Sequence, residues 1–267
     1  MLSTAQEADI SSARIHPTAV VDSAARLGKD VTIGPFAVIE DDVSIGDRTS
    51  ISNHVTIKAF TTIGKDCRVH QNSVIGGIPQ DLKFGNEVTQ TIIGNNVIIR
   101  EFVTINRGTK AVGKTTVGNN VLLMANVHLA HDCTIGENVI LANLVTLGGH
   151  VEIEEWASLG GGVLVHQFSR VGAYVFVGGG FRVVQDVPPF ILAAGEPLKY
   201  TGINHVGLRR RGYSPEERQT IKKVYRLYFR SELNRSTVLE KIRDDFPSNK
   251  NIDRIINFIS SSDRGII

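Results

Sequence analysis

The chain has 267 residues, of which 42% are hydrophobic and 21% are charged, and its formal net charge is +2. This composition is typical of a soluble globular protein, and no apolar run reaches the roughly 18 residues that a transmembrane helix needs. The first residues include Glu7 and Asp9 and lack the basic and apolar segments of a signal peptide. We therefore expect a cytoplasmic protein with no integral membrane segment.

Residues 1–14 carry no repeat, and we expect them to form a loosely attached lead-in. From Ile15 to Val183 almost every sixth residue is Ile, Leu or Val. The exceptions are Asp81, Glu87 and Ala111. A period of six fits neither the turn of a helix nor the alternation of a flat strand. Hexapeptide repeats build a parallel β-helix, which we predict for residues 15–190.

Each hexad is expected to supply one short strand whose aliphatic residue points inward, and three hexads to close one triangular coil. Stacked coils would form three parallel sheets with strands about 4.8 Å apart. The fourth residue after each aliphatic is mostly small or β-branched, and two of these positions hold Cys67 and Cys133. We expect both to be small buried thiols rather than a disulfide or metal ligands.

The repeat lapses twice, over residues 76–92 and 108–116, and resumes in the same phase after each lapse. An insertion that preserves the phase is expected to leave the coil as a loop and return to it. Loops held on a rigid scaffold often carry functional residues. Both segments are therefore candidates for part of a binding site.

Residues 191–267 do not continue the repeat, and we predict a connector followed by a C-terminal α-helical domain. Ser214-Pro215-Glu216-Glu217 combines an N-cap serine, a proline in the first turn and a glutamate at the third helical position. Two further helical stretches are expected near residues 236–246 and 249–261. Such a domain would cover the last coil of the solenoid.

Basic residues are concentrated near the C-terminus. Between Lys199 and Arg243, twelve Lys or Arg accompany four Glu, a local excess of +8. This excess indicates an anionic partner or ligand. The aromatic stacking platform or helix-turn-helix expected of a nucleic-acid-binding protein is absent from the sequence, so we expect no nucleic acid partner.

A coil of three hexads places residues 18 apart above one another. His131 is then expected to stack over Gly149 and Gly149 over Gln167, while Asp132 stacks over His150. Histidine accepts a proton near neutral pH, so His131 beside Asp132 is a candidate general base. Gly149 would leave space next to it, and its N–H could approach a developing oxyanion.

Five motifs contain these residues or accompany them. They are His128-Leu129-Ala130-His131-Asp132, Gly149-His150, His166-Gln167, Gln80-Asp81-Leu82-Lys83 in the first lapse, and Asn204 with Arg210-Arg211. Together they resemble the UDP-N-acetylglucosamine acyltransferase family of lipid A biosynthesis, and the resemblance covers essentially the whole chain from residue 15. Hexads alone would indicate only the wider superfamily of hexapeptide acyltransferases.

The resemblance implies a left-handed parallel β-helix that assembles as a homotrimer with active sites between neighbouring subunits. It also implies a reaction, the first step of lipid A biosynthesis. An (R)-3-hydroxyacyl group would pass from acyl carrier protein to the 3-hydroxyl of UDP-N-acetylglucosamine. No cofactor and no metal are expected.

The resemblance further implies a role for each matched residue. His131 would be the general base, Asp132 its support and Gly149 the donor to the oxyanion. Residues implied to bind substrates are Gln80, Asp81, Lys83, His128, His150, His166, Gln167, Asn204, Arg210 and Arg211. Phe176 and Gly179 would affect acyl-chain length. Val206 departs from the family pattern Asn-x-Glu, so a carboxylate contact to the uridine or ribose end is expected to be missing or supplied differently.

Three alternatives remain open at this point. The acceptor could carry an amine at position 3, which would give an amide product. A related hexapeptide acyltransferase could use another acyl donor such as coenzyme A. A γ-type carbonic anhydrase, also a trimeric β-helix with histidines at the subunit interface, would hold zinc with three histidines and a water. The Asp132 motif and the Gln80–Lys83 loop favour acyl transfer.

Overall fold

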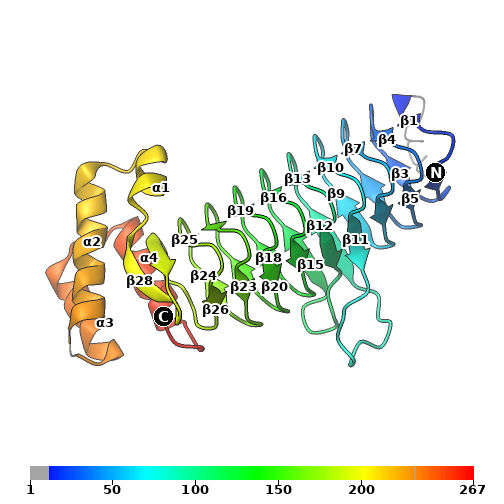
Figure 1. Cartoon of the computed structure of the whole chain (residues 1–267). Coiled ribbons are helices and arrows are strands. Elements are labelled where there is room, and N and C mark those ends of the chain that lie inside the picture. The colour runs from blue at the N-terminus through cyan, green and yellow to red at the C-terminus, as the bar shows by residue number, and fades with distance from the viewer. Residues whose placement is uncertain (1–11, 232) are drawn as a thin grey trace, which may run out of the picture.

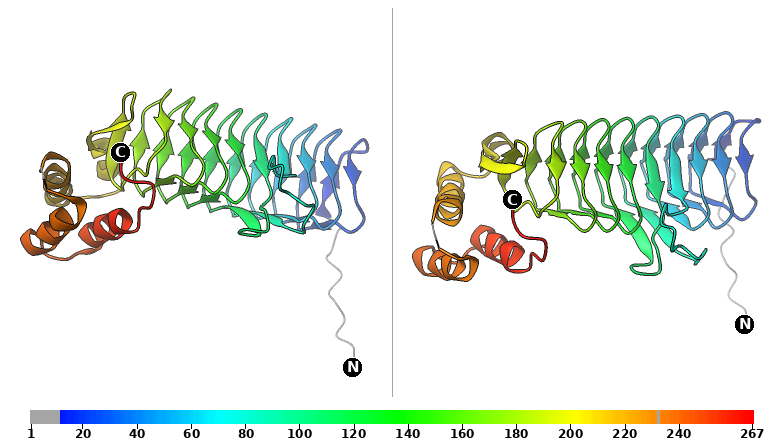
Figure 2. Two further views of the ribbon diagram at one scale, coloured as in Figure 1. Left: turned by 90° about the horizontal axis from the view of Figure 1, so that it is seen from below. Right: turned by 60° about the horizontal axis from the view of Figure 1, so that its bottom comes forward.

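The computed structural model describes residues 12–231 and 233–267, and these form a long parallel β-helix followed by helices (Figure 1). Most of the expected lead-in, residues 1–11, lies outside the described residues. Arg14 already belongs to strand β1 (Arg14–Ile15) and pairs with Thr32. The helices lie at the end of the solenoid that is remote from β1 (Figure 2).

Three hydrogen-bonded sheets, here called A, B and C, run along the described solenoid. Sheet A contains β1, β4 (Thr32–Ile33), β7 (Ser50–Ile51), β10 (Arg68–Val69), β13 (Ile98–Ile99), β16 (Leu122–Leu123), β19 (Ile140–Leu141), β22 (Ser158–Leu159), β25 (Phe176–Val177), β27 (Ile191–Ala194) and β28 (Lys199–Ile203). Sheet B contains β2 (Val20–Val21), β5 (Val38–Ile39), β8 (Thr56–Ile57), β11 (Val74–Gly77), β14 (Thr104–Asn106), β17 (His128–Leu129), β20 (Thr146–Leu147), β23 (Leu164–Val165) and β26 (Arg182–Val183). Sheet C contains β3 (Arg26–Leu27), β6 (Ser44–Ile45), β9 (Thr61–Ile63), β12 (Gln90–Ile93), β15 (Lys114–Val117), β18 (Thr134–Ile135), β21 (Glu152–Ile153) and β24 (Arg170–Val171).

The pairing register follows the repeat. Ile33 pairs with Ile51, one coil of three hexads further on. The pairings that cross residues 78–89 or 107–113, three for each segment, span more residues, because these segments leave the coil and return in phase. Both loops project from the same edge of the solenoid (Figure 1, Figure 2).

The interior is filled by the aliphatic residues of the repeat. From Leu27 to Val183 each of them is at most 5% exposed, and each such burial contributes roughly 1.5–3 kcal/mol. Cys67 and Cys133 are both buried and free, as predicted. Burial raises the pKa of the Cys133 thiol to about 12, so this thiol is chemically inert.

The corners between the sheets are turned by residues with positive φ, and many of these are not glycine. Phe36 (φ 58°) and Asp132 (φ 61°) are examples. The glycines that directly follow the aliphatic residues have another role. A Cβ on Gly34 would lie 2.8 Å from the backbone nitrogen of Asn53 on the next coil, so glycine is needed there for close approach of the coils.

Residues after 190 begin with a feature that the sequence did not predict. β27 and β28 form an antiparallel pair that extends sheet A, and four helices follow. These are α1 (His205–Arg210), α2 (Pro215–Arg230), α3 (Arg235–Asp245) and α4 (Lys250–Ser260). The predicted capping box is present, with Ser214 and Glu217 each accepting from the other's backbone N–H. Among the described helices none is long and apolar enough to cross a membrane.

Two isoleucines on sheet A test the role of the repeat. Ile51 is 2% exposed, whereas Ile15 in the first coil is 40% exposed. We expect Ile51→Ala to lower the free energy of unfolding by about 2–5 kcal/mol and Ile15→Ala by less than about 1 kcal/mol. Chemical denaturation at one protein concentration measures both. Equal losses of unfolding free energy in the two variants would contradict the conclusion that the buried repeat residues stabilise the core.

Candidate active site

The corner between sheets B and C positions the polar cluster predicted from the repeat. Asp132, His150 and Phe168 occupy equivalent corner positions on successive coils, each with φ between 61° and 64°. The rings of His150 and Phe168 stack with centroids 4.4 Å apart, and the His150 N–H donates to the His131 carbonyl. The predicted column is therefore present, and it presents its side chains along one edge of the solenoid.

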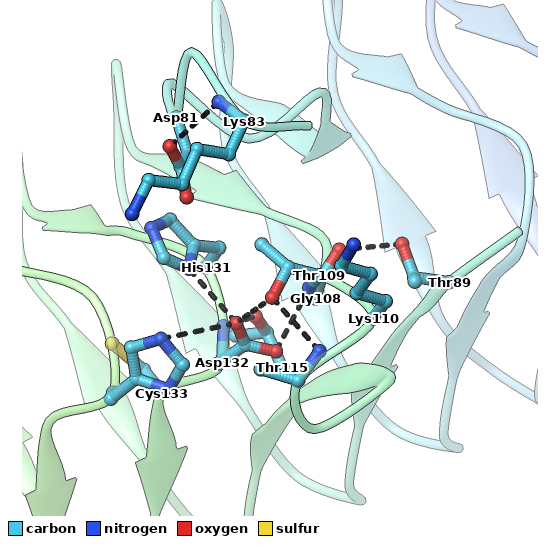
Figure 3. Close-up of polar contacts among 12 residues, drawn as sticks. Asp81, Lys83, Thr89, Gly108, Thr109, Lys110, Thr115, His131, Asp132 and Cys133 are labelled. Atoms are coloured by element: carbon cyan, nitrogen blue, oxygen red, sulfur yellow. Dashed lines mark hydrogen bonds and ion pairs between the residues drawn. The ribbon is translucent and has the colours of Figure 1, made fainter. Parts of the chain in front are cut away.

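The Asp132 carboxylate is the centre of a hydrogen-bond network (Figure 3). Its side chain is fully buried. Oδ1 accepts from the Thr109 backbone N–H at 2.9 Å, and Oδ2 accepts from the Thr109 hydroxyl at 2.6 Å. His131 Nδ1 lies 2.9 Å from Oδ2, and His150 Nε2 lies 3.5 Å from it. The Asp132 N–H donates to the Thr115 hydroxyl, which fixes the backbone of the corner.

This network assigns the tautomer of His131. An ionised carboxylate only accepts hydrogen bonds, so Nδ1 carries the proton and Nε2 has a free lone pair. The His131 side chain remains 14% exposed, so Nε2 can meet a substrate. A histidine oriented by a buried carboxylate in this way is suited to act as a general base.

Gly149 lies directly against the His131 ring. A Cβ at this position would be 2.6 Å from Cε1 and 2.7 Å from Nε2 of His131, so a larger residue would displace the imidazole. Within the described part of the chain, the Gly149 N–H donates to no protein acceptor. The amide is thus free to donate to an oxyanion formed beside the base.

The loop of residues 78–89 carries Gln80, Asp81 and Lys83. Asp81 Oδ1 accepts from the Lys83 N–H at 2.9 Å, which forms a tight turn. In Figure 3 the Lys83 side chain extends from this turn toward the His131 ring. The loop is held by Arg107, whose guanidinium lies 5.4 Å from the ring centroids of both Phe60 and Phe84.

Three further predicted residues lie on or beside sheet B, next to the cluster. His128 Nδ1 is 2.7 Å from the Thr104 hydroxyl, and burial lowers the pKa of His128, which favours its neutral form. His166 and Gln167 are exposed. Arg264, in the C-terminal tail, donates to His166 Nδ1 at 3.2 Å, so the tail closes one side of this region.

A second group of predicted residues lines a groove of about 770 Å³ between sheet A and α1. The group comprises Phe176, Asn204, Arg210 and Arg211, and Val206 also lines the groove. The Arg211 guanidinium stacks on Trp156 at 3.6 Å from the ring centroid.

The groove residues differ in how free their polar groups are. The Asn204 amide is engaged at both ends, because Oδ1 accepts from the Gly207 N–H and Nδ2 donates to the Tyr174 carbonyl. Its visible role is to cap α1. Burial and the nearby Lys222 and Arg218 lower the pKa of His205, which marks this end of the groove as electropositive.

Gly179 lies outside this groove, on the corner between sheets A and B. A Cβ there would be 3.0 Å from the Gly161 carbonyl oxygen of the preceding coil. Phe176, by contrast, stands on the outer face of sheet A and is 39% exposed. The two residues predicted to affect chain length are therefore close in sequence but belong to different surfaces of one chain.

The two groups of site residues do not meet within one chain. His131, Asp132 and Gly149 lie at the edge between sheets B and C, and sheet A is the face of the triangular solenoid opposite that edge. Arg210 and Arg211 lie over sheet A. A site that uses both groups needs a second copy of the chain.

Thr109 and Thr115 are site residues that the sequence did not reveal. Threonines are common in this repeat, and nothing local distinguishes these two. The available signal was that Thr109 lies in the second lapse, which leaves the coil beside the corner of Asp132. Trp156 and Arg264 were also missed, because the residues that they contact are distant in sequence.

One donor atom from each of His131, Asp132 and His150 lies within 4.8 Å of the other two, which is close enough to consider a metal ion. Asp132 Oδ2, however, already accepts hydrogen bonds from Thr109 and His131. Only two of the three residues are histidines, so the set differs from the three histidines of the carbonic anhydrase alternative.

Comparison with known proteins agrees with the sequence and the geometry. The family model described as UDP-N-acetylglucosamine O-acyltransferase, domain 2, matches residues 186–267, and the hexapeptide-repeat model matches residues 24–59, 42–77 and 114–149. The acyl-[acyl-carrier-protein]–UDP-N-acetylglucosamine O-acyltransferase of Chlorobaculum parvum is 57% identical over 94% of this chain and 96% of its own length. The enzyme of the same name from Halorhodospira halophila is 44% identical over 95% and 99%.

Solved structures give the same result. The UDP-N-acetylglucosamine acyltransferase of Francisella novicida superposes with a TM-score of 0.91 and 41% identity, over 95% of this chain and 93% of its own. That of Bacteroides fragilis gives 0.92 and 45%, over 94% and 99%. The predicted fold class, a left-handed parallel β-helix with a C-terminal α-helical region, is confirmed. The chain belongs to the acyl-[acyl-carrier-protein]–UDP-N-acetylglucosamine O-acyltransferase family.

Proposed function

We propose that this protein transfers an (R)-3-hydroxyacyl group from acyl carrier protein to the 3-hydroxyl of UDP-N-acetylglucosamine, as the first step of lipid A biosynthesis in the cytoplasm. Family membership supports the substrates and the reaction class. The observation that carries the chemistry is the His131–Asp132 hydrogen bond, 2.9 Å long, with Gly149 against the ring. No cofactor is needed for this reaction, because a thioester is already activated.

The proposed reaction begins with attack of the sugar 3-hydroxyl on the thioester carbonyl, while His131 Nε2 takes the hydroxyl proton. Asp132 stabilises the resulting imidazolium through Nδ1. The Gly149 N–H donates to the tetrahedral oxyanion. Collapse of the intermediate forms the ester and expels the carrier thiolate, which takes the proton back from His131.

The position of two groups supports the proposed substrate contacts: the ring centroid of His150 is 5.1 Å from that of His131, and Lys83 extends toward the His131 ring (Figure 3). We propose that Asp81, Lys83, His128 and His150 hold the sugar and the donor, together with Gln80, His166 and Gln167. The electropositive groove with Arg210 and Arg211 is proposed to bind phosphates, for which the guanidinium is apt. Phe176 and Gly179 are proposed to bound the acyl chain.

We further propose a homotrimer in which each active site combines the His131 edge of one subunit with the α1 groove of its neighbour. The separation of these surfaces within one chain supports it. A heterologous contact repeated around a three-fold axis would create three identical sites.

Product analysis tests the activity directly. The protein is incubated with UDP-N-acetylglucosamine and a panel of 3-hydroxyacyl carrier proteins, and the products are weighed by mass spectrometry. The expected product has the mass of the sugar nucleotide plus one hydroxyacyl group less water. Reaction only with a 3-amino acceptor or with acyl-coenzyme A would contradict the proposal, as would stoichiometric zinc and loss of activity on chelation.

Removal of the base should abolish turnover. We expect His131→Ala to lower kcat by about 10²- to 10⁴-fold without changing assembly, because its side chain lies outside the aliphatic core. Asp132→Ala should cause a smaller loss. Steady-state rates and size-exclusion chromatography of both variants measure this. A near-wild-type rate for His131→Ala would refute the general-base assignment.

The contact between Gly149 and the base gives a second prediction. Gly149→Ala would place a methyl group 2.6 Å from the imidazole, so we expect kcat to fall by about 10- to 100-fold while KM changes little. Gly113→Ala is a less informative comparison because its φ is +83°. Gly161→Ala is the better control, since its nearest contact is 3.3 Å away and its φ is not positive. Equal rates for the two variants would contradict the proposed packing of the base.

Mixed assemblies test whether each site spans two subunits. His131→Ala chains and Arg210→Ala/Arg211→Ala chains should each be inactive, but co-assembly should restore activity. If equal amounts mix at random, about one site in four combines an intact His131 edge with an intact α1 groove. Activity of the mixture is compared with that of each variant alone. No recovery in assemblies verified by mass spectrometry would contradict a shared site.

A further inference from the structure

Thr109 makes two hydrogen bonds to Asp132, one to each carboxylate oxygen. The backbone N–H binds Oδ1 and the hydroxyl binds Oδ2. Thr109 is 7% exposed, and its hydroxyl is engaged by Asp132 Oδ2 and by the Ala111 N–H. Its contacts to the catalytic pair therefore pass through the carboxylate.

The polarity of the hydroxyl contact is fixed by a second bond. Thr109 Oγ1 also accepts from the Ala111 N–H at 3.2 Å. The single hydroxyl hydrogen is thus available for donation to Asp132 Oδ2. The same carboxylate oxygen also accepts from His131 Nδ1. The two donors of Thr109 and the Nδ1–H of His131 together hold the Asp132 carboxylate in a single orientation.

The position of Thr109 is set by the loop that carries it. Gly108 precedes Thr109, and its backbone lies close to that of Lys114. A Cβ on Gly108 would be 2.2 Å from the Lys114 backbone nitrogen, so only glycine fits there. The Gly108 carbonyl accepts from the buried Thr89 hydroxyl, and the Gly108 N–H donates to the Gln90 carbonyl. The Gly113 N–H closes the turn on the Thr109 carbonyl.

We propose that Thr109 is a positioning residue for acyl transfer: its hydroxyl fixes the Asp132 carboxylate, which in turn holds His131 as the Nδ1–H tautomer. The inference rests on the proposed function, because it assumes that His131 is the base. It also gives the second lapse of the repeat a purpose, since residues 107–113 leave the coil and bring Thr109 to the catalytic corner.

Thr109→Val removes the hydroxyl and keeps the shape and the backbone donor. We expect kcat to fall roughly 10-fold, the usual effect of losing one hydrogen bond to a charged group, while KM for UDP-N-acetylglucosamine changes less than about 2-fold. Thr109→Ser retains the hydroxyl and should restore the rate. If valine prevents folding, alanine takes its place.

Thr89→Val is the matched control. Thr89 is 2% exposed, and its hydroxyl donates to the Gly108 carbonyl in the loop that carries Thr109, but it makes no hydrogen bond to Asp132. A role in loop packing alone would make Thr89→Val as harmful to kcat as Thr109→Val. We expect Thr89→Val to lower thermal stability and to reduce kcat less than Thr109→Val does, because both hydrogen bonds from Thr109 to Asp132 stay in place.

A double-mutant cycle separates positioning from structure. In an Asp132→Ala background, measured in single-turnover reactions, Thr109→Val should have no further effect, because its target is gone. A further loss equal to that in the wild-type background would overturn the inference, and so would unchanged kcat for Thr109→Val. These results leave the general-base proposal intact if His131→Ala is inactive, whereas an active His131→Ala variant overturns both.

Discussion

Every coil of this solenoid must turn three corners, and from Asp30 onward the corners of the regular coils are turned through a residue with positive φ. This constraint determines where chemistry can be placed. The aliphatic residues are committed to the core, and the strands are only two residues long over most of the solenoid. A corner side chain projects outward from a rigid frame, as Asp132 and His150 do. The geometry of the proposed catalytic residues is therefore set by the backbone of the coil, with little freedom for adjustment.

The same rigidity separates the two halves of the proposed site. The edge between sheets B and C and the face formed by sheet A lie on opposite sides of a rigid solenoid. The proposed base and the basic groove of α1 therefore stay apart in one chain. The proposed mechanism therefore requires assembly of two chains at each site. The loops at residues 78–89 and 107–113 add what the regular coil lacks, namely polar side chains such as Lys83 beside His131 (Figure 3) and a buried donor pair for Asp132.

The sequence predicted the fold and the centre of the site, because both depend on the period. Residues 18 apart must stack, and this alone placed Asp132 next to His150 on the neighbouring coil. It could not reveal Thr109, whose contact with Asp132 depends on the path of a loop outside the period. Nor could it predict that the Asn204 amide caps α1, or that β27 and β28 form a hairpin, since these depend on contacts made only when the last coil is covered. The period also could not show why glycine follows an aliphatic residue at Gly34, where it allows close approach of neighbouring coils.

The central claim is that a carboxylate saturated by loop donors holds His131 with its proton on Nδ1 and a lone pair on Nε2. The most direct measurement is ¹⁵N NMR of the imidazoles in histidine-labelled protein, with His131 assigned by its loss in a His131→Gln variant. For the neutral ring we predict a directly bonded proton on Nδ1 and none on Nε2. A neutral ring protonated on Nε2 would contradict the account, because it would remove both the hydrogen bond to Asp132 and the lone pair of the base.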